Sequence, residues 1–221
     1  MPALHEPVRG AVGGAAQVLP RRARDRRALL SAQLPLVFVT VGTDYHPFDR
    51  MSRFIDGWLE GGGSEVARCF VQTGTSAVPK MAEHRQYLGH EEMDAMVREA
   101  AVVVCHGGPG TIMLASTLGK RPIVVPRRKQ FGEHVDDHQL AFTQRIARDG
   151  AILLAQTDDE LRSCLDGALG LAGSAAELPP AGAGPGPAVA AFEQLIDELL
   201  NKTRTPKRRA VGSDPATRRS A

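Results

Sequence analysis

Short apolar runs alternate with segments of helical periodicity through the middle of the chain. Short apolar runs are typical of strands buried in a parallel sheet, and they occur here at 36–41, 102–105, 122–125 and 151–154, while RCFVQ at 68–72 also predicts a strand. Apolar residues recur at helical spacing between them, at 47–59, 93–97, 110–118 and 135–148. Thr157 and Glu160 form a capping box that predicts a further helix through residue 169. This alternation predicts an α/β fold with a Rossmann-like, doubly wound parallel sheet.

The two ends of the chain differ in composition from this alternating region. We expect residues 1–33, rich in Ala, Gly and Arg, to be a disordered basic extension, and residues 34–172 to form the α/β domain. Residues 173–189 are a Gly/Ala/Pro linker, 190–201 a helix with an apolar stripe that could dock a partner, and 202–221 a disordered basic tail. A chain of 221 residues has room for one well-buried domain of this kind.

The formal net charge of +2 conceals an uneven distribution. Residues 1–35 carry about +4 and residues 201–221 about +6, which leaves 36–200 near −8. An acidic core argues against a nucleic-acid partner, whereas the basic ends could contact anionic lipid or simply be solvated. Because no apolar run reaches about 18 residues and the N-terminus has no apolar signal core, we expect a cytoplasmic protein.

Three cysteines, Cys69, Cys105 and Cys164, stand far apart without paired spacing. Two of them lie inside apolar runs that predict strands. We therefore expect all three to be buried, reduced thiols rather than disulfide partners or zinc ligands.

Glycine-containing turns follow three of the predicted strands. In an open α/β sheet, ligands bind beyond the carboxyl ends of the strands, where backbone N–H groups at helix N-termini face an anion. Each turn alone could serve packing, but the three together predict a site for a phosphate-bearing ligand. The third turn has neither the Lys of a P-loop nor GxGxxG spacing. The candidate binding residues are Gly42, Thr43, Gln72, Gly74, His106, Gly107, Gly108, Gly110 and Thr111.

A polar segment, residues 127–139, follows the predicted strand at 122–125. Its many hydrogen-bonding groups suit a polyhydroxylated ligand, although a solvated helix start would look similar. His134 and His138 are four residues apart with Asp137 near, a spacing that could also bind zinc. The segment lacks the Glu of the HExxH motif, so we expect no metal and no cofactor.

Four segments together resemble a known family. VTVGTDYHPFDRM, FVQTGTS, VVCHGGPGTIMLASTLGKRPIVVPR and GEHVDDHQ are similar to the C-terminal domain of glycosyltransferase family 28, over about residues 36–169. They most resemble its stand-alone bacterial members in exopolysaccharide assembly, which are similar to the catalytic subunit of the dolichol-linked N-acetylglucosamine transferase. The resemblance implies the C-terminal half of a GT-B glycosyltransferase that binds a UDP-sugar. A separate, membrane-anchored subunit would bind the lipid-linked acceptor at the inner face of the plasma membrane.

The resemblance also implies roles for individual residues. The diphosphate would be lined by Gly42, Thr43, Gly108, Gly110 and Thr111, the sugar hydroxyls would be held by His138 and Gln139, and Arg127 could add positive charge near the phosphates. Many relatives have an acidic residue that grips the ribose where this chain has Leu114. The ribose is then either held otherwise or held more weakly.

The implied reaction is inverting transfer of a hexose or N-acetylhexosamine from UDP to a polyprenyl-diphosphate-linked acceptor. Helix-terminal N–H groups can stabilise the leaving UDP without a metal. The general base is expected on the acceptor half; His46 and His106 are candidates here, though each could be a structural loop histidine. Two alternatives remain: a non-catalytic module that binds nucleotide-sugar, and a metal-dependent hydrolase built on His134, Asp137 and His138.

Overall fold

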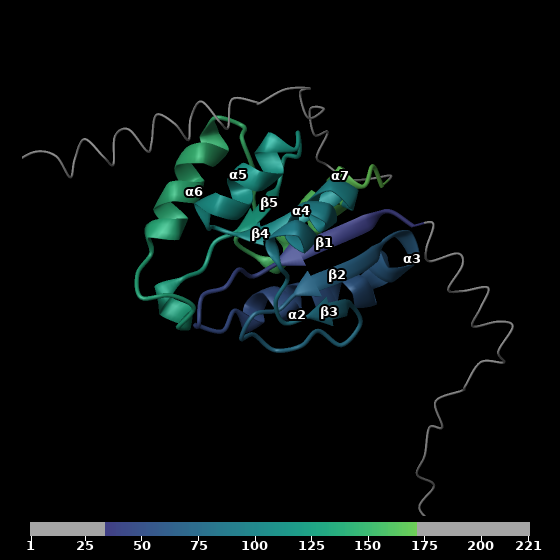
Figure 1. Ribbon diagram of the computed structural model, residues 1–221, viewed down its shortest axis with the longest axis horizontal. Helices are drawn as coiled ribbons and strands as arrows, with labels where there is room; N and C mark the ends of the chain where they lie inside the picture. The colour runs from purple at the N-terminus through teal and green to yellow at the C-terminus, as the bar shows by residue number, and fades with distance from the viewer. Residues whose placement is uncertain (1–33, 172–221) are drawn as a thin grey trace, which may run out of the picture. The chain divides into compact units, whose positions relative to one another are not determined.

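Six parallel strands form one sheet in the computed structural model, which describes residues 34–171 of the chain (Figure 1). Their order across the sheet is β3-β2-β1-β4-β5-β6. The strands are β1 (Leu36–Thr40), β2 (Arg68–Gln72), β3 (Glu83–Arg85), β4 (Val102–His106), β5 (Ile123–Val125) and β6 (Leu153–Leu154). From β1 the chain adds β2 and β3 on one side of the sheet, and from β4 it adds β5 and β6 on the other side. The carboxyl ends of these two central strands therefore border the crevice where doubly wound sheets bind ligands.

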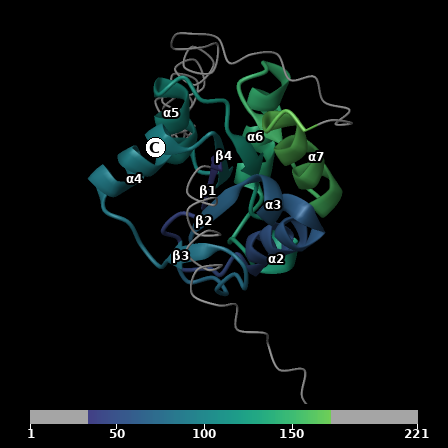
Figure 2. The ribbon, with the colours of Figure 1, turned by 90° about the vertical axis from the view of Figure 1, so that its right-hand side faces the viewer.

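Helices cover both faces of this sheet. They are α2 (Asp49–Trp58), continued by a π-helical turn η1 (Leu59–Gly63) and α3 (Ser64–Val66), then α4 (His90–Glu99), α5 (Pro109–Thr117), the 3₁₀ turn η2 (Lys129–Phe131), α6 (His138–Arg148) and α7 (Asp158–Ala168). On one face, Met51 of α2 and Leu161 of α7 pack in a common core with Val39 of β1. On the other face, α4 and α5 pack against Phe38 of β1, and α6 packs through Ile146 against β4 and β5. Figure 2 shows α4 and α5 on one side of the strands and α2, α3 and α7 on the other.

The predicted doubly wound parallel fold is confirmed, with local differences that include β6, which begins at Leu153 and not at residue 151 as predicted. Strand β3 was missed, because its three residues are all exposed and carry no apolar pattern; it is held at the sheet edge by pairing with β2. Helix α6 begins at His138, not at residue 135 as predicted. The His138 backbone N–H donates to the Asp136 carboxylate over 3.1 Å, which satisfies a helix-start donor at this later position. The predicted Thr157 cap is confirmed, since its hydroxyl accepts from the Glu160 N–H over 3.2 Å.

All three cysteines are free thiols, as expected. Cys69 and Cys105 are buried, and burial raises the pKa of each to about 12. Cys164 is only partly buried, so the expectation of a buried thiol was wrong there: it lies on α7 at the margin of the core. Buried thiols with raised pKa values are poor nucleophiles and poor metal ligands at neutral pH.

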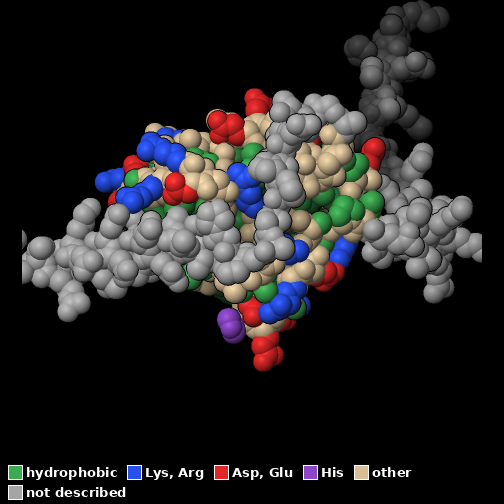
Figure 3. All heavy atoms as spheres, turned by 90° about the horizontal axis from the view of Figure 1, so that it is seen from above, with side chains coloured by type: hydrophobic (Ala, Val, Ile, Leu, Met, Phe, Trp, Pro, Cys, Tyr) green, Lys and Arg blue, Asp and Glu red, His purple; other side chains and the backbone are tan. Residues whose placement is uncertain are grey.

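Several predicted segments lie outside the described residues: the extension 1–33, the linker 173–189, the helix 190–201 and the tail 202–221. Within residues 34–171, no helix is both long enough and apolar enough to cross a bilayer. Figure 3 shows Lys and Arg side chains interspersed with Asp and Glu over the part of one face that grey atoms leave visible. That part of the surface carries no continuous basic field of the kind that binds nucleic acid.

Candidate functional site

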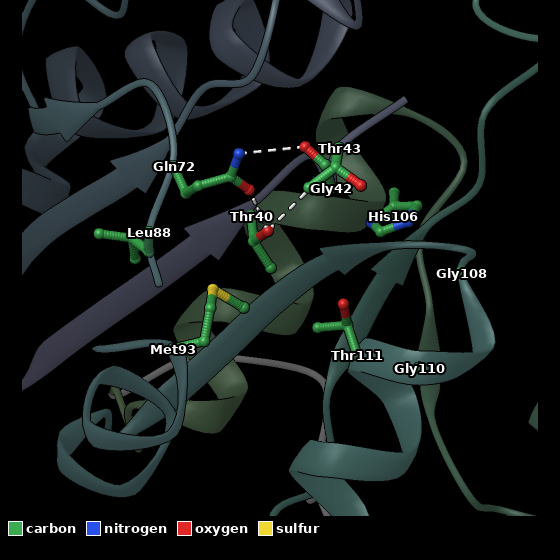
Figure 4. A pocket seen from close by; sticks show the side chains of 10 residues that line it. All are labelled: Thr40, Gly42, Thr43, Gln72, Leu88, Met93, His106, Gly108, Gly110 and Thr111. Atoms are coloured by element: carbon green, nitrogen blue, oxygen red, sulfur yellow. Dashed lines mark hydrogen bonds between the residues drawn. The ribbon is translucent and has the colours of Figure 1, made fainter. Parts of the chain in front are cut away.

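A pocket of about 230 Å³ lies at the crevice between the carboxyl ends of β1 and β4. Figure 4 shows the turn after β1 and the turn after β4 meeting across it, with His106 beside it and Thr111 at the start of α5. Its lining residues are Thr40, Gly42, Thr43, Gln72, Leu88, Met93, His106, Gly108, Gly110 and Thr111. Seven of the candidate binding residues named from the sequence therefore line one pocket, at the position where a doubly wound sheet is expected to bind ligand.

The buried side chain of Gln72 organises the β1 wall of the pocket. Its amide donates to the carbonyl oxygen of Gly42 over 3.0 Å and to that of Gln86 over 2.9 Å, while its oxygen accepts from the Thr40 hydroxyl. The same Thr40 hydroxyl accepts from the Gly42 N–H over 3.2 Å. Because both amide protons and the oxygen of Gln72 are used, this residue positions the Gly42 turn rather than offering a free group to a ligand.

The opposite wall is the N-terminus of α5. Pro109 occupies its first turn, and that turn holds no acidic side chain, in contrast to the first turns of α4 and α7. The N–H groups and the positive end of the helix dipole are then available to an anion. A Cβ added at Gly110 would meet nothing within 4 Å, and Gly110 lines the pocket, so this position has room for a side chain beside it.

The ring of His106 is wedged between two glycines of the pocket. A Cβ at Gly42 would lie 2.4 Å from its Cε1 atom, and a Cβ at Gly108 would lie 2.2 Å from its Nε2 atom. Burial, followed by the positive charge of Arg127, lowers the pKa of His106 to about 4. The imidazole is therefore neutral at physiological pH, and a base this weak holds a proton poorly at neutral pH.

This depressed pKa predicts a specific pH dependence of stability. The His106 contribution is complete above the unfolded pKa of about 6.5 and falls as pH drops toward 4, because the unfolded state then binds the extra proton. Between pH 7.5 and 5.0 the loss should reach about 2 kcal/mol in the free energy of unfolding. Urea unfolding of wild type and His106→Asn at both pH values isolates this contribution. Equal pH dependence in the two proteins would contradict it.

Arg127 lies behind the pocket, where its side chain is fully buried. Its guanidinium donates to three carbonyl oxygens: Val41 over 2.9 Å, His46 over 2.7 Å and Glu133 over 3.0 Å. These bonds tie the segment after β1 to the segment after β5. Arg127 does not line the pocket, so the positive charge expected of it near the phosphates would act from behind, while its guanidinium is engaged with backbone carbonyl oxygens.

A second buried arginine completes this connection. Arg50 of α2 makes a two-point ion pair with Glu133, with N–O distances of 2.9 and 2.8 Å, and also donates to the Pro126 carbonyl oxygen over 2.8 Å. Glu133 further accepts from the Arg128 N–H over 2.9 Å. The sequence reasoning singled out neither Arg50 nor Glu133. Arg50 lies in a polar-looking helix start and Glu133 in a loop, so no local pattern links them.

Three other candidate residues lie outside the pocket. Gly74 lines a separate hollow of about 450 Å³ beside β3, and a Cβ there would meet the Gly42 carbonyl oxygen at 3.0 Å. Gly107 is buried, and a Cβ there would lie 3.0 Å from both Gln139 and Thr143 of α6. Gln139 is itself buried, and its amide oxygen accepts from the Arg127 N–H over 3.4 Å. Gly107 and Gln139 thus form the packing contact between the β4 turn and α6.

The remaining predicted histidines gather with two aspartates into what we call the histidine cluster: Asp44, His46, His134, Asp136 and His138. The His46 and His134 ring centroids are 5.9 Å apart, and those of His134 and His138 are 4.8 Å apart. Asp44 contacts both His46, at 2.7 Å, and His134, at 3.6 Å. Asp136, not the predicted Asp137, is the carboxylate between His134 and His138. Asp137 instead accepts from the Lys129 N–H over 2.9 Å, away from this arrangement.

Three pocket residues were missed by the sequence reasoning: Thr40, Leu88 and Met93. Thr40 belongs to an apolar strand run and Met93 to a helical stripe, so each looked like a core residue. The signal for Thr40 was its place as the last residue of β1, beside the predicted turn. Leu114, the position for which the resemblance implied an acidic residue in many relatives, is a partly buried residue packed in the core formed by α4, α5 and β1.

The sequence model of the family described as glycosyltransferase family 28 C-terminal domain matches residues 36–162, more than half of the chain. Among curated proteins, none matches. Similar solved structures include MurG of Acinetobacter baumannii, with 22% identity over 81% of this chain and 52% of that chain and a TM-score of 0.46. The glycosyltransferase SnogD from Streptomyces nogalater has 19% identity over 84% and 48% of the two chains and a TM-score of 0.42. The present chain spans about half the length of these proteins.

Proposed function

Because this chain belongs to glycosyltransferase family 28 through its C-terminal domain, we propose that it is the donor-binding subunit of an inverting glycosyltransferase. The donor is a UDP-hexose or UDP-N-acetylhexosamine, and the acceptor is a sugar on polyprenyl diphosphate, in exopolysaccharide synthesis. The observation that carries the proposal is the pocket between the Gly42 turn and the N-terminus of α5. It offers backbone N–H groups and a helix dipole to a diphosphate.

The chemistry of the leaving group supports this assignment. As the glycosidic bond breaks, negative charge develops on UDP, and preorganised N–H groups at the start of α5 lie where they can stabilise it. Thr43 and Thr111 add hydroxyl groups at the two sides of the pocket. Arg127 contributes only from behind, since its guanidinium holds loop carbonyl oxygens. In this proposal no metal ion takes part in binding the diphosphate.

The acceptor and its deprotonation are assigned to a partner subunit. His106 has a pKa of about 4 and is a weak base at neutral pH, which favours a general base on the acceptor half. The exposed apolar side chains of Tyr45, Phe131 and Val135, all in the segments that follow β1 and β5, favour a protein partner over this edge. We place the assembled enzyme at the inner face of the plasma membrane, where the partner is anchored.

Calorimetric titration of the full chain with UDP tests the donor site, with and without EDTA. The Gly110→Trp variant should bind UDP at least about tenfold more weakly, a loss of about 1.4 kcal/mol, because its side chain enters open space at the pocket. Thr117→Trp adds the same side chain at the exposed far end of α5 and is the matched control. Equal binding by wild type and Gly110→Trp would overturn this placement of the donor.

A non-catalytic module is the second candidate, favoured by Leu114 in place of the acid that grips ribose in relatives. The catalytic subunit and the binding module differ in whether the sugar of the bound UDP-sugar is transferred. Sugar transfer from UDP to a lipid-linked acceptor in the presence of the acceptor subunit supports the enzyme. UDP binding without transfer in the same reconstituted mixture supports the binding module.

A further inference from the structure

The histidine cluster contains three side chains with the donor types of a transition-metal site. His134, Asp136 and His138 each present one ligand atom, and these atoms lie within 4.8 Å of one another. They come from the segment just before α6 and from its first residue, so one short stretch of backbone fixes all three. Two imidazoles and a carboxylate are ligands that zinc and similar divalent ions prefer.

One pair of donor atoms already has the spacing that a tetrahedral ion requires. Metal–ligand bonds of about 2.0–2.2 Å place neighbouring ligand atoms roughly 3.4 Å apart. His134 Nδ1 lies 3.3 Å from the Asp136 carboxylate oxygen. His138 Nδ1 is in direct contact with the same carboxylate, so only a small opening of this pair would admit an ion. The side chains of Asp136 and His138 are more than half exposed, which gives an ion access to the site.

The contacts of the His134 ring bear on the ligand role of its Nδ1 atom. Nδ1 accepts only a long hydrogen bond of 3.4 Å from the Asp136 N–H, which an ion bound at Nδ1 would replace. On the far side of the ring, Nε2 lies 3.6 Å from Asp44. Asp44 is itself held by the His46 N–H over 2.8 Å and by the His46 ring. At 3.6 Å this is an ionic contact and not a hydrogen bond, and it places a negative charge behind the ring, where carboxylates support many metal-bound histidines.

The three ligand side chains differ in burial, and His134 is the most buried of them. The His134 side chain is 13% exposed, whereas His138 and Asp136 are 64% and 52% exposed. Such a site has one anchored ligand, two accessible ligands and at least one position left open for water or another oxygen donor.

We propose that His134 Nδ1, the Asp136 carboxylate and His138 Nδ1 form a binding site for a divalent transition-metal ion such as zinc. Asp44 supports the site by placing its negative charge behind the His134 ring. The site differs from the metal arrangement suggested by sequence spacing, because Asp136 takes the place of Asp137.

Titration of the full, tag-free chain with zinc measures this site, and cobalt absorption reports its geometry. Wild type should bind one ion, and His134→Ala, Asp136→Asn and His138→Ala should each weaken binding at least about tenfold. Asp44→Asn should weaken it about tenfold without removing a ligand. The matched controls are His90→Ala, an exposed histidine of α4, and Cys164→Ser, the only partly buried thiol among residues 34–171. Both controls should bind as wild type does.

Two results would overturn the proposal. One is the absence of zinc binding by the folded wild-type chain. The other is binding that persists unchanged in the three ligand variants, which would place the ion elsewhere. Thermal unfolding of each variant in EDTA shows whether the fold is intact, so that a lost site is distinguished from a lost structure. UDP titration of the same variants is a separate measurement and does not decide the outcome.

Discussion

Replacing Glu133 by Ala is expected to lower the free energy of unfolding by about 3–5 kcal/mol. Glu133 is buried and pairs with Arg50 at two points, while its carbonyl oxygen accepts from Arg127. Removing the carboxylate leaves the Arg50 guanidinium buried without its counter-charge. It also leaves the Arg128 N–H, which donates to that carboxylate, without its acceptor. Urea unfolding followed by circular dichroism measures the loss.

Two further variants separate the charge from the packing. Glu133→Gln keeps the shape and one acceptor oxygen, so it should be less destabilising than Glu133→Ala. The double variant Arg50→Met with Glu133→Leu removes both charges and should recover much of the loss, since a buried pair can be replaced by apolar residues at little cost. A loss below about 1 kcal/mol for Glu133→Ala would show that the pair does not stabilise the loops.

We expect Gly108→Ala and Gly42→Ala each to lower the free energy of unfolding substantially. Removing the His106 ring should recover this loss to a different extent in the two variants. The added methyl group of either variant meets the His106 ring, at 2.2 and 2.4 Å respectively, and overpacking of this kind costs about 1–3 kcal/mol. Gly108 has an ordinary φ of −78°, whereas Gly42 has φ +80°, which adds about 1–3 kcal/mol for any other residue. Both variants should also weaken UDP binding because both glycines line the pocket.

Combining each variant with His106→Ala tests these causes separately. Removal of the ring should restore most of the stability lost in Gly108→Ala. In Gly42→Ala it should restore only the part lost to the clash with the ring, because the strain of the positive φ remains. The reference for both double variants is His106→Ala alone. If the losses in the free energy of unfolding caused by Gly108→Ala and His106→Ala simply add in the double variant, the two positions do not interact, contrary to the packing described.

The sequence pattern predicted the order and type of the central elements because burial on both faces makes β1, β4 and β5 continuous apolar runs. The pattern failed at β3, whose exposed residues are held only by main-chain pairing to β2. It also misplaced the start of α6. There the decisive factor is a side chain, Asp136, that accepts the His138 N–H.

The pocket was predictable for a topological reason. Glycine turns after parallel strands must meet at one edge of the sheet, so Gly42, Gly108 and Gly110 come together wherever the strands are adjacent. The role of Arg127 was not predictable, because a cation at a strand end looks the same in a sequence whether it faces phosphate or backbone carbonyl oxygens. Its partners, Val41 and His46, lie more than 80 residues away along the chain.

The two outer strands of the sheet have a consequence for behaviour at high concentration. β3 has three residues, Glu83–Arg85, with a carboxylate at one end and a guanidinium at the other, and β6 has only two residues. Edges this short, one of them also charged, offer few unpaired main-chain groups to a strand of another molecule, so they oppose intermolecular sheet extension and the aggregation that follows from it. The long apolar strands that would aggregate most readily, β1 and β4, are shielded by neighbours on both sides.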